Sequence, residues 1–252
     1  MSVKVSIEQG IAEVYLDHPP VNALDSDGWT QLAETISSLG RNEQVRVVIL
    51  AAKGRGFCAG VDIKELARDA SLITKVNKGC YDAFAAIHDC AVPVIAACHG
   101  FVLGGGIGLV GSCDLIVSSD DATFGLPEID RGALGAASHL LRMFPIQKVR
   151  KMLYTGEPIT AAEAYRLGAL EAVVASDELM PKAREIAQSI ASKSPKAVRL
   201  AKESLNGIEP FDVKHAYRFE QGFTLELYTS PDSQEARDAF VEKRDVSFKD
   251  KG

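Results

Sequence analysis

Short apolar runs alternate with amphipathic stretches over the first half of the chain, and amphipathic stretches follow one another over the second half. Residues 3–7 and 11–16 alternate between apolar and polar positions around Gln9-Gly10, a pattern that predicts a β-hairpin. Continuous apolar runs further along predict strands that are buried on both faces of a largely parallel sheet. These runs are residues 45–51, 94–98 and 115–118, with a shorter strand-like segment at 122–125.

Helical patterns with one apolar face fill the intervals between these strands and then the C-terminal half. The first runs from a cap at Ser26 or Asp27 to Leu39, and the second covers residues 73–88. Strands with crossover helices, followed by helices alone, predict an α/β core with an α-helical C-terminal part. The later helices are predicted at residues 138–144, 146–154, 161–167, 177–193, 195–206, 211–229 and 232–243, with a short strand at 173–174.

The composition is that of a globular protein with a sizeable core. Of 252 residues, 46% are hydrophobic, and the net charge of −6 comes from interspersed acidic and basic residues. The lack of a basic block argues against binding to nucleic acid or to an anionic membrane. No apolar run is long enough to span a bilayer, and the alternating N-terminus lacks a signal sequence. Five cysteines without a C-x-x-C pair predict reduced core thiols in a cytoplasmic protein, with no disulfide and no metal site.

Residues 94–114 carry the strongest chemical signal, because a β-rich run is followed by three consecutive glycines, Gly104 to Gly106, and an apolar helix. The first turn of a helix has N–H groups without intrahelical partners, and glycines there let a ligand oxygen approach the backbone. Gly106, Gly108 and Gly111 match the G-x-G-x-x-G fingerprint of a dinucleotide site. The same turn suits an oxyanion hole for a thioester enolate. Close packing of the helix without any ligand is the third interpretation.

Segments along nearly the whole chain resemble the crotonase superfamily, the relatives of enoyl-CoA hydratase and isomerase. In the family's order they are residues 20–24 (PVNAL), 56–65 (GFCAGVDIKE), 93–97 (PVIAA), 100–106 (GFVLGGG), 113–114 (CD), 122–128 (ATFGLPE) and 239–244 (AFVEKR). The resemblance implies a crotonase-type α/β fold, with a spiral of ββα units over residues 1–195. It also implies an α-helical C-terminal region, residues 196–252, that packs homotrimers or dimers of trimers.

The resemblance assigns the thioester oxygen of an acyl-CoA substrate to two backbone N–H groups, which map onto Val61 and Gly105. Main-chain donors, one of them at a helix N-terminus, stabilise an enolate without needing a proton. Coenzyme A is then part of the substrate, and no separate cofactor is implied. The dinucleotide fingerprint becomes an accidental match, which leaves an NAD-dependent reductase as the least favoured class. Further CoA-binding positions of the family map onto Leu24, Ala59, Asp62 and Ile63, together with Val61 and Gly105.

The chain departs from a simple hydratase, in which two glutamates hold one water. The first glutamate falls on Gly108, which has no side chain, and the second falls on Glu128, the predicted catalytic carboxylate. Hydration by a glutamate pair is therefore disfavoured, whereas a single base can still move a proton between carbons. His139 and Asp130 follow closely, and an imidazole beside a carboxylate can act on water near neutral pH. The alternatives are a packing role for His139 and a surface pair of Asp130 with Arg131.

Within the superfamily, the chain is most similar to the actinobacterial CoA-thioester hydrolases that open a steroid ring late in cholesterol catabolism. The similarity implies a retro-Claisen cleavage, in which Glu128, with His139, activates a water that attacks a ring ketone of a cyclic oxoacyl-CoA. The bond to the carbon beside the thioester then breaks, and an enolate forms at Val61 and Gly105. Residues 56–65, 104–111, 120–140 and 217–227 carry this resemblance.

Two other functions stay open from the sequence. One is a hydratase or isomerase that acts on a linear enoyl-CoA, and the other is a non-catalytic acyl-CoA-binding relative. On the helix at residues 211–229, Tyr217, Gln221 and Thr224 share one side, and Glu220 and Glu226 are expected to be surface charges. Lys243, Arg244 and Lys249 lie near the end of the chain that binds the CoA phosphates in the family, and a solvated charged tail is the alternative.

Overall fold

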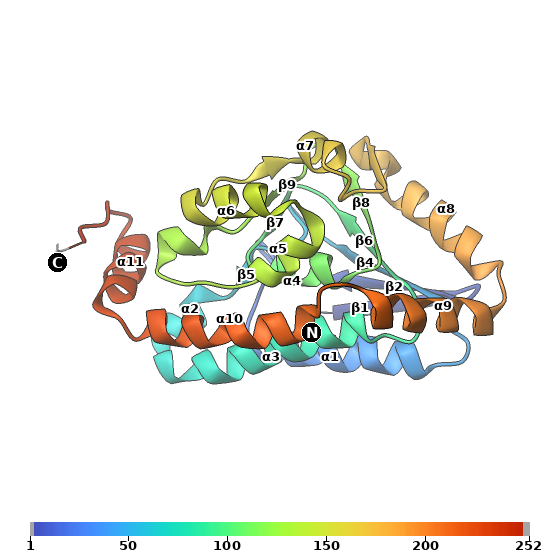
Figure 1. Cartoon of the computed structure of the whole chain (residues 1–252), viewed down its shortest axis with the longest axis horizontal. Helices are drawn as coiled ribbons and strands as arrows, with labels where there is room; N and C mark the ends of the chain where they lie inside the picture. The colour runs from blue at the N-terminus through green and yellow to red at the C-terminus, as the bar shows by residue number, and fades with distance from the viewer. Residues whose placement is uncertain (1–2, 249–252) are drawn as a thin grey trace.

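A six-stranded sheet runs through the middle of the computed structural model, which describes residues 3–248 (Figure 1). The strand order is β1-β2-β4-β6-β8-β11, in which β1 and β2 are antiparallel and the other neighbours are parallel. The predicted hairpin and the predicted parallel strands are therefore confirmed. The bounds are β1 (Val3–Glu8), β2 (Ile11–Leu16), β4 (Val47–Ala52), β6 (Val94–Cys98), β8 (Leu115–Ser119) and β11 (Ala172–Val174).

Short strands form a second layer that follows the order of the main sheet. They are β3 (Ala23–Leu24), β5 (Gly60–Val61), β7 (Phe101–Leu103), β9 (Thr123–Gly125) and β10 (Ile159–Thr160). β3 pairs with β5, Cys58 before β5 forms a bridge with Val102 of β7, and β7 pairs with β9. Each of the first four short strands follows a long strand and precedes a helix. The chain thus repeats a ββα unit as a spiral, as the sequence predicts.

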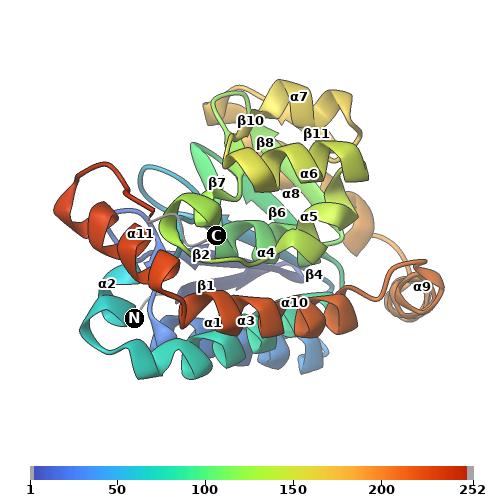
Figure 2. The ribbon, with the colours of Figure 1, turned by 60° about the vertical axis from the view of Figure 1, so that its left-hand side comes forward.

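Helices cover both faces of the sheet, and the C-terminal ones also extend beyond it (Figures 1 and 2). α10 lies alongside α3 and α5, and α11 contacts the 3-10 helix Pro127–Arg131. The helices are α1 (Ser26–Arg41), α2 (Ile63–Arg68), α3 (Ile73–His88), α4 (Gly105–Ser112), α5 (Ala137–Met143), α6 (Ile146–Thr155), α7 (Ala161–Arg166), α8 (Leu179–Ala191), α9 (Pro195–Ile208), α10 (Val213–Tyr228) and α11 (Pro231–Glu242). Two further 3-10 turns are Ala70–Leu72 and Ser176–Glu178.

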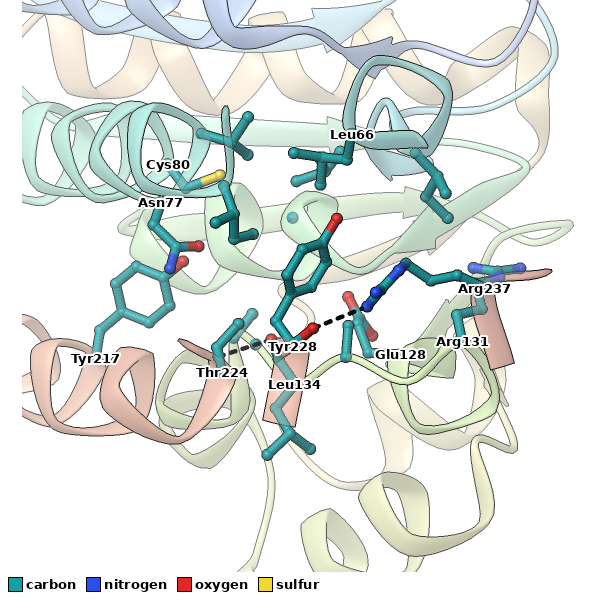
Figure 3. A pocket seen from close by; sticks show the side chains of 18 of the residues that line it. Leu66, Asn77, Cys80, Glu128, Arg131, Leu134, Tyr217, Thr224, Tyr228 and Arg237 are labelled. Atoms are coloured by element: carbon teal, nitrogen blue, oxygen red, sulfur yellow. Dashed lines mark hydrogen bonds between the residues drawn. The ribbon is translucent and has the colours of Figure 1, made fainter. Parts of the chain in front are cut away.

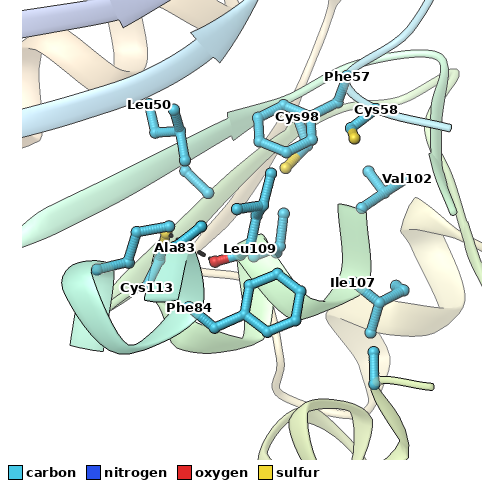
Figure 4. Packing of buried hydrophobic residues seen from close by; sticks show 14 of the residues in the cluster. Leu50, Phe57, Cys58, Ala83, Phe84, Cys98, Val102, Ile107, Leu109 and Cys113 are labelled. Atoms are coloured by element: carbon cyan, nitrogen blue, oxygen red, sulfur yellow. Dashed lines mark hydrogen bonds between the residues drawn. The ribbon is translucent and has the colours of Figure 1, made fainter. Parts of the chain in front are cut away.

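Alternate residues of each long strand enter two separate hydrophobic cores, because side chains along a strand point to opposite faces in turn. Val48 and Leu50 of β4 join the larger core with residues of α1, α3 and α4. Ile49 and Ala51 join a smaller core with α8 on the other face. Figure 4 shows part of the larger core, in which Phe84 of α3 lies next to α4. This packing fixes α4, and with it the glycine turn, against α3.

The start of α1 differs from the sequence prediction. Asp25 is its N-cap, with Oδ1 accepting from Gly28 N at 2.7 Å, rather than Ser26 or Asp27. Ser26 is buried instead and donates from N and Oγ to the carboxylate of Glu65 on α2, at 2.9 and 2.7 Å. These two bonds attach α2 to α1. Among residues 3–248, no helix has both the length and the hydrophobicity that crossing a bilayer requires.

Candidate active site

The stacking of two ββα units brings two glycine turns into contact. Gly60 begins β5 with φ +93°, and Gly104, with φ +58°, is the N-cap of α4. Both conformations lie in the left-handed region that favours glycine. A Cβ atom on Gly60 would lie only 2.9 Å from the backbone N of Gly105. The glycines therefore let the backbone before Val61 touch the first turn of α4.

Two backbone N–H groups become available at this contact. Neighbouring N–H groups of a strand point to opposite edges. Since the N–H of Asp62 donates to Leu24 O at 2.9 Å, that of Val61 points away from β3. Gly105 is the first residue of α4, so its N–H has no intrahelical acceptor and lies at the positive end of the helix dipole. Val61 and Gly105 both line one cavity, where a ligand oxygen could accept from them.

Glu128 faces the same turn from the 3-10 helix Pro127–Arg131. A Cβ atom on Gly104 would overlap Glu128 Oε1, so this carboxyl lies directly against the turn before Gly105. Its other oxygen, Oε2, is buried and has no hydrogen-bond partner within the described residues. Burial raises the pKa of Glu128 to about 7, although the positive charge of Arg131 acts in the opposite direction. Such a group can exchange a proton near neutral pH.

The cavity in front of Glu128 is largely apolar and holds about 850 Å³ of space when its open mouth is included (Figure 3). It lies between the loop around β5, helices α2 and α3, the segment that follows Glu128, and helices α10 and α11. A cavity of this size and character suits a small, mostly apolar acyl group. Its walls include Leu66, Ile73, Val76, Cys80, Phe84, Leu134 and Tyr217.

Three buried polar atoms without partners in the described part of the chain belong to residues that line this cavity. They are Glu128 Oε2, Asn77 Nδ2 and Tyr228 Oη. A fourth, Trp29 Nε1, belongs to a ring so close that a Cβ on Gly105 would lie 2.8 Å from it. Buried polar groups are nearly always hydrogen-bonded, and each exception needs an explanation. A ligand with oxygen atoms would supply acceptors for the two donors in the cavity wall, Asn77 Nδ2 and Tyr228 Oη.

Gly108, at the position of the first hydratase glutamate, has no side chain, and another residue fills the space that a side chain there would need. A Cβ atom on Gly108 would overlap the ring of Phe84. Phe84 is 2% exposed and packs edge-on against Trp29, with ring centroids 5.7 Å apart. The space that a second acid would need is therefore filled by an aromatic side chain. The sequence reveals only the missing carboxylate, and the tertiary structure shows why none can be placed there.

His139 does not reach the cavity. It is 2% exposed and packs behind two cavity residues, with ring centroids 4.8 Å from Phe84 and 5.0 Å from Tyr217. Burial lowers the pKa of His139 to about 3, so the imidazole is neutral and a weak base at neutral pH. These contacts favour the packing interpretation of His139 and do not place it beside a water near Glu128.

Asp130 also lies outside the cavity lining. It is exposed, and a Cβ on Gly156, at the end of α6, would meet its carboxylate. Nor does it pair with Arg131, whose guanidinium lies 4.8 Å from the ring centroid of Phe240 and lines the cavity. Although Asp130 is close to Glu128 in sequence, only Glu128 lines the cavity.

The positions matched to CoA binding divide into two groups. Ala59, Val61, Ile63 and Gly105 line the cavity. Leu24 is fully buried opposite Val61 in the β3–β5 pair, and Asp62 caps α2 by accepting from Lys64 N at 2.9 Å. At the end of the chain, Lys243 is the C-cap of α11, and Arg244 pairs with Glu235 and Glu242. Lys249 lies outside the described residues.

α10 contributes more to the site than the sequence suggests. Tyr217, Gln221 and Thr224 share one buried side, as predicted. Glu220, expected at the surface, instead accepts from Ala137 N at 3.0 Å and Ser138 N at 2.7 Å, at the start of α5. Burial raises the pKa of Glu220, while these N–H groups oppose the shift. No local pattern could reveal this bond, because its partners are more than 80 residues apart in the chain.

Known proteins are similar to this chain over nearly its whole length. A profile of the Enoyl-CoA hydratase/isomerase family matches residues 6–251. A protein of Rhodococcus jostii (strain RHA1) is 53% identical over 235 residues, 92% of this chain and 91% of its own. One of Mycobacterium tuberculosis is 50% identical over 238 residues, 94% and 96%. Both are named (7aS)-7a-methyl-1,5-dioxo-2,3,5,6,7,7a-hexahydro-1H-indene-carboxyl-CoA hydrolase.

Solved structures show the same fold. The crystal structure of an enoyl-CoA hydratase from Mycobacterium smegmatis is 32% identical, with a TM-score of 0.80 over 98% of each chain. The family profile and the two curated relatives each cover more than nine-tenths of this chain. The repeated ββα units, the glycine turn before α4 and these matches lead to one conclusion: the chain belongs to the enoyl-CoA hydratase/isomerase family, the crotonase superfamily.

Proposed function

We propose that this chain is a hydrolase that opens a ring of a cyclic oxoacyl-CoA by retro-Claisen cleavage, in the degradation of a steroid nucleus such as that of cholesterol. The names of the two relatives at 53% and 50% identity, both hydrolases of a bicyclic dioxo CoA ester, support this substrate class. The observation that carries the proposal is a single buried carboxyl, Glu128, against the glycine turn, with Phe84 in the space of a second acid.

The backbone has the first role in the reaction. The thioester oxygen accepts hydrogen bonds from the N–H groups of Val61 and Gly105, at the contact between β5 and α4. Fixed donors at a helix N-terminus stabilise the negative charge that develops on that oxygen and need no rearrangement during the reaction. Removing one such donor typically costs about 3 kcal/mol of transition-state stabilisation.

Glu128 has the second role. Its carboxylate takes a proton from a water whose oxygen forms a bond to the ring ketone carbon. The tetrahedral intermediate then reforms a C=O bond and breaks the ring C–C bond, and the electron pair passes to the thioester enolate. Protonated Glu128 returns the proton to carbon, so that one water has been added and one ring opened. A carboxyl with a pKa near 7 is suited to both transfers at neutral pH.

Replacement of Glu128 tests this assignment. Glu128→Gln is expected to lower kcat by about 10²- to 10⁴-fold, the range for loss of an acid–base catalyst, and to leave binding of the CoA ester intact. Mass spectrometry of cyclic and linear acyl-CoA esters before and after incubation supplies the readout. A gain of one water with an opened ring is the expected result, and a variant that stays within about threefold of the wild type would contradict the role of Glu128.

The same panel separates the other candidate functions. A single base can shift a double bond, so a linear enoyl-CoA isomerase is the competing activity that the lone Glu128 permits. Hydration of crotonyl-CoA would favour a hydratase despite the blocked position at Gly108. Binding of every ester without turnover of any would favour a non-catalytic relative.

The assembly and location of the protein belong to the same proposal. We place the chain in the cytoplasm as a homotrimer or dimer of trimers, with residues 196–252 as the assembly region. Most of the large apolar side chains that are exposed in the single chain lie after residue 195, which supports this region as a subunit contact.

A further inference from the structure

Asn77 and Tyr228 both hold a hydrogen-bond donor in the cavity wall that the proposed chemistry does not use, and of the two residues Asn77 is half-buried and Tyr228 buried. Tyr228, the last residue of α10, is 7% exposed and lines the cavity. Its hydroxyl is buried and has no partner within residues 3–248. Since a buried hydroxyl without a partner destabilises a fold, its presence in a ligand cavity points to an acceptor on the ligand.

Arg237 of α11 fixes the ring of Tyr228 in place. Its guanidinium carbon lies 4.0 Å from the ring centroid, and Nη1 donates to the backbone oxygen of Tyr228 at 3.2 Å (Figure 3). Arg237 itself is held by Ser233 Oγ and by Gln234 Oε1, the latter at 2.8 Å. The phenol ring is thus clamped by a side chain that has its own hydrogen-bond partners.

The chemistry of the free group defines what it can recognise. Burial raises the pKa of Tyr228, so the hydroxyl stays protonated and can donate at neutral pH. It therefore fits a neutral acceptor such as a ketone oxygen. The cavity wall as a whole is largely apolar, with Leu66 and Ile73 among the lining residues, so an acyl carbon skeleton can pack there. Glu128 and the N–H groups of Val61 and Gly105 come from other elements and serve the reacting atoms.

The reaction proposed above leaves one polar group of the acyl ring without a partner. In a dioxo bicyclic ester, one ketone is attacked by water and the other passes through unchanged. Resting on the proposed function, we infer that the hydroxyl of Tyr228 donates a hydrogen bond to the ring ketone that the reaction leaves intact. Tyr228 is then a specificity-determining residue and Arg237 its positioning residue.

This arrangement makes discrimination between acyl groups the measurable property. A site built to bond a substrate oxygen rejects the analogue that lacks it, because the buried polar group is then left unpaired. The probes are the dioxo bicyclic ester named for the relatives and its analogue with a methylene in place of the ring ketone that water does not attack. The wild-type chain is expected to prefer the dioxo ester in kcat/KM by about 10²-fold or more.

Tyr228→Phe removes only the hydroxyl. It is expected to reduce this preference at least about tenfold by lowering kcat/KM for the dioxo ester, with the value for the methylene analogue unchanged or raised. Arg237→Met is expected to reduce the preference in the same direction, since the ring loses its clamp. The matched control is Tyr154→Phe, because Tyr154 lies on α6 and is 69% exposed. That variant should retain the wild-type preference.

The outcomes separate this inference from the proposed function. Equal losses of kcat/KM for both esters in Tyr228→Phe would mean that the residue only packs, and an unchanged preference would mean that it binds no ketone. Either result overturns the inference while ring opening by the wild type upholds the proposed function. If the wild type opens the ring of neither ester, the proposed function fails. Calorimetry then decides the inference: the ratio of the dissociation constants of the two esters is expected to differ between the wild type and Tyr228→Phe, and an unchanged ratio would overturn it.

Discussion

At the scale of single residues, the environment of Glu128 links catalysis to stability. Burial raises its pKa from an ordinary 4.5 to about 7. In the unfolded chain the carboxyl keeps its ordinary pKa, so the folded protein binds more protons between about pH 4.5 and pH 7. The free energy of unfolding therefore falls as pH rises through this window. The cost at higher pH is about 3 kcal/mol, from 1.36 kcal/mol per pKa unit.

Glu128→Gln should abolish this pH dependence, because glutamine carries no charge at any pH. We expect the stability of Glu128→Gln relative to the wild type to increase by about 3 kcal/mol between pH 4.5 and pH 8. Urea unfolding across this range measures the difference. Glu226→Gln, the same substitution at an exposed position, is the control. A constant offset between wild type and Glu128→Gln would contradict the buried carboxyl.

Gly108 shows how one missing side chain decides between reaction types. Its hydrogen faces the ring of Phe84, so Gly108→Ala should destabilise the protein by about 1–3 kcal/mol although alanine favours helices. Gly222→Ala is the matched control, since a Cβ there meets nothing within 4 Å on α10 and should be neutral or stabilising. Thermal unfolding at fixed protein concentration checks both. Gly108→Glu should not acquire hydration of crotonyl-CoA, and its acquisition would contradict the steric argument.

At the scale of elements, α10 is hydrogen-bonded both to α3, which carries Asn77, and to the segment that follows Glu128 in the chain. Gln221 Nε2 donates to Asn77 O at 2.7 Å, and Thr224 Oγ1 donates to Leu134 O at 2.9 Å. The N-cap residue of α5 makes no side-chain hydrogen bond to the start of the helix. Glu220 of α10 caps α5 instead, by accepting from its first N–H groups. One helix thus shapes two walls of the cavity.

Glu220→Gln tests this role of α10. Glutamine has one acceptor oxygen where glutamate has two, so its amide NH₂ would face a backbone N–H of Ala137 or Ser138. We expect a loss of about 1–3 kcal/mol in unfolding free energy, as for a buried donor left unsatisfied, and a lower kcat/KM. Glu226→Gln on the exposed side of the same helix is the control. Equal stability of the two variants would show that Glu220 does not cap α5.

At the scale of the whole molecule, the exposed apolar side chains of the C-terminal helices bear on the proposed assembly. Leu205 and Ile208 of α9 are 63% and 72% exposed, and Phe219 of α10 is 70% exposed. Lys202 anchors α9 to the body by donating to Asp114 at 2.7 Å, while the apolar residues point to solvent. Large exposed apolar patches on soluble chains usually mark contacts with other chains.

Light scattering measures the proposed assembly directly. We expect a mass of three or six times 27.0 kDa for the wild type. The double variant Leu205→Asp with Ile208→Asp should lower that mass, because charges at an apolar contact are costly to bury. Lys196→Asp, on an exposed position of the same helix, should not. A monomeric wild type would contradict the proposed trimer.

Much of the fold follows from local pattern. The hairpin, the buried strands and the helix at 73–88 have the predicted bounds to within about two residues, because period and burial are encoded in contiguous residues. The ββα spiral followed from a resemblance in motif order and is confirmed. The residue pattern alone pointed to the glycine turn at 104–106, the resemblance mapped a catalytic acid onto Glu128, and the chain showed that Gly108 carries no second one.

Only the tertiary structure decided which groups meet. Stacking of the β5 and β7 units places Gly60 against Gly105, and the packing of α3 puts Phe84 in the space beside Gly108. It also buries His139 behind the cavity, turns Asp130 away from it, and brings Tyr228 into its wall. These contacts join residues far apart in the chain. They depend on how whole elements pack, which the period of any one segment does not contain.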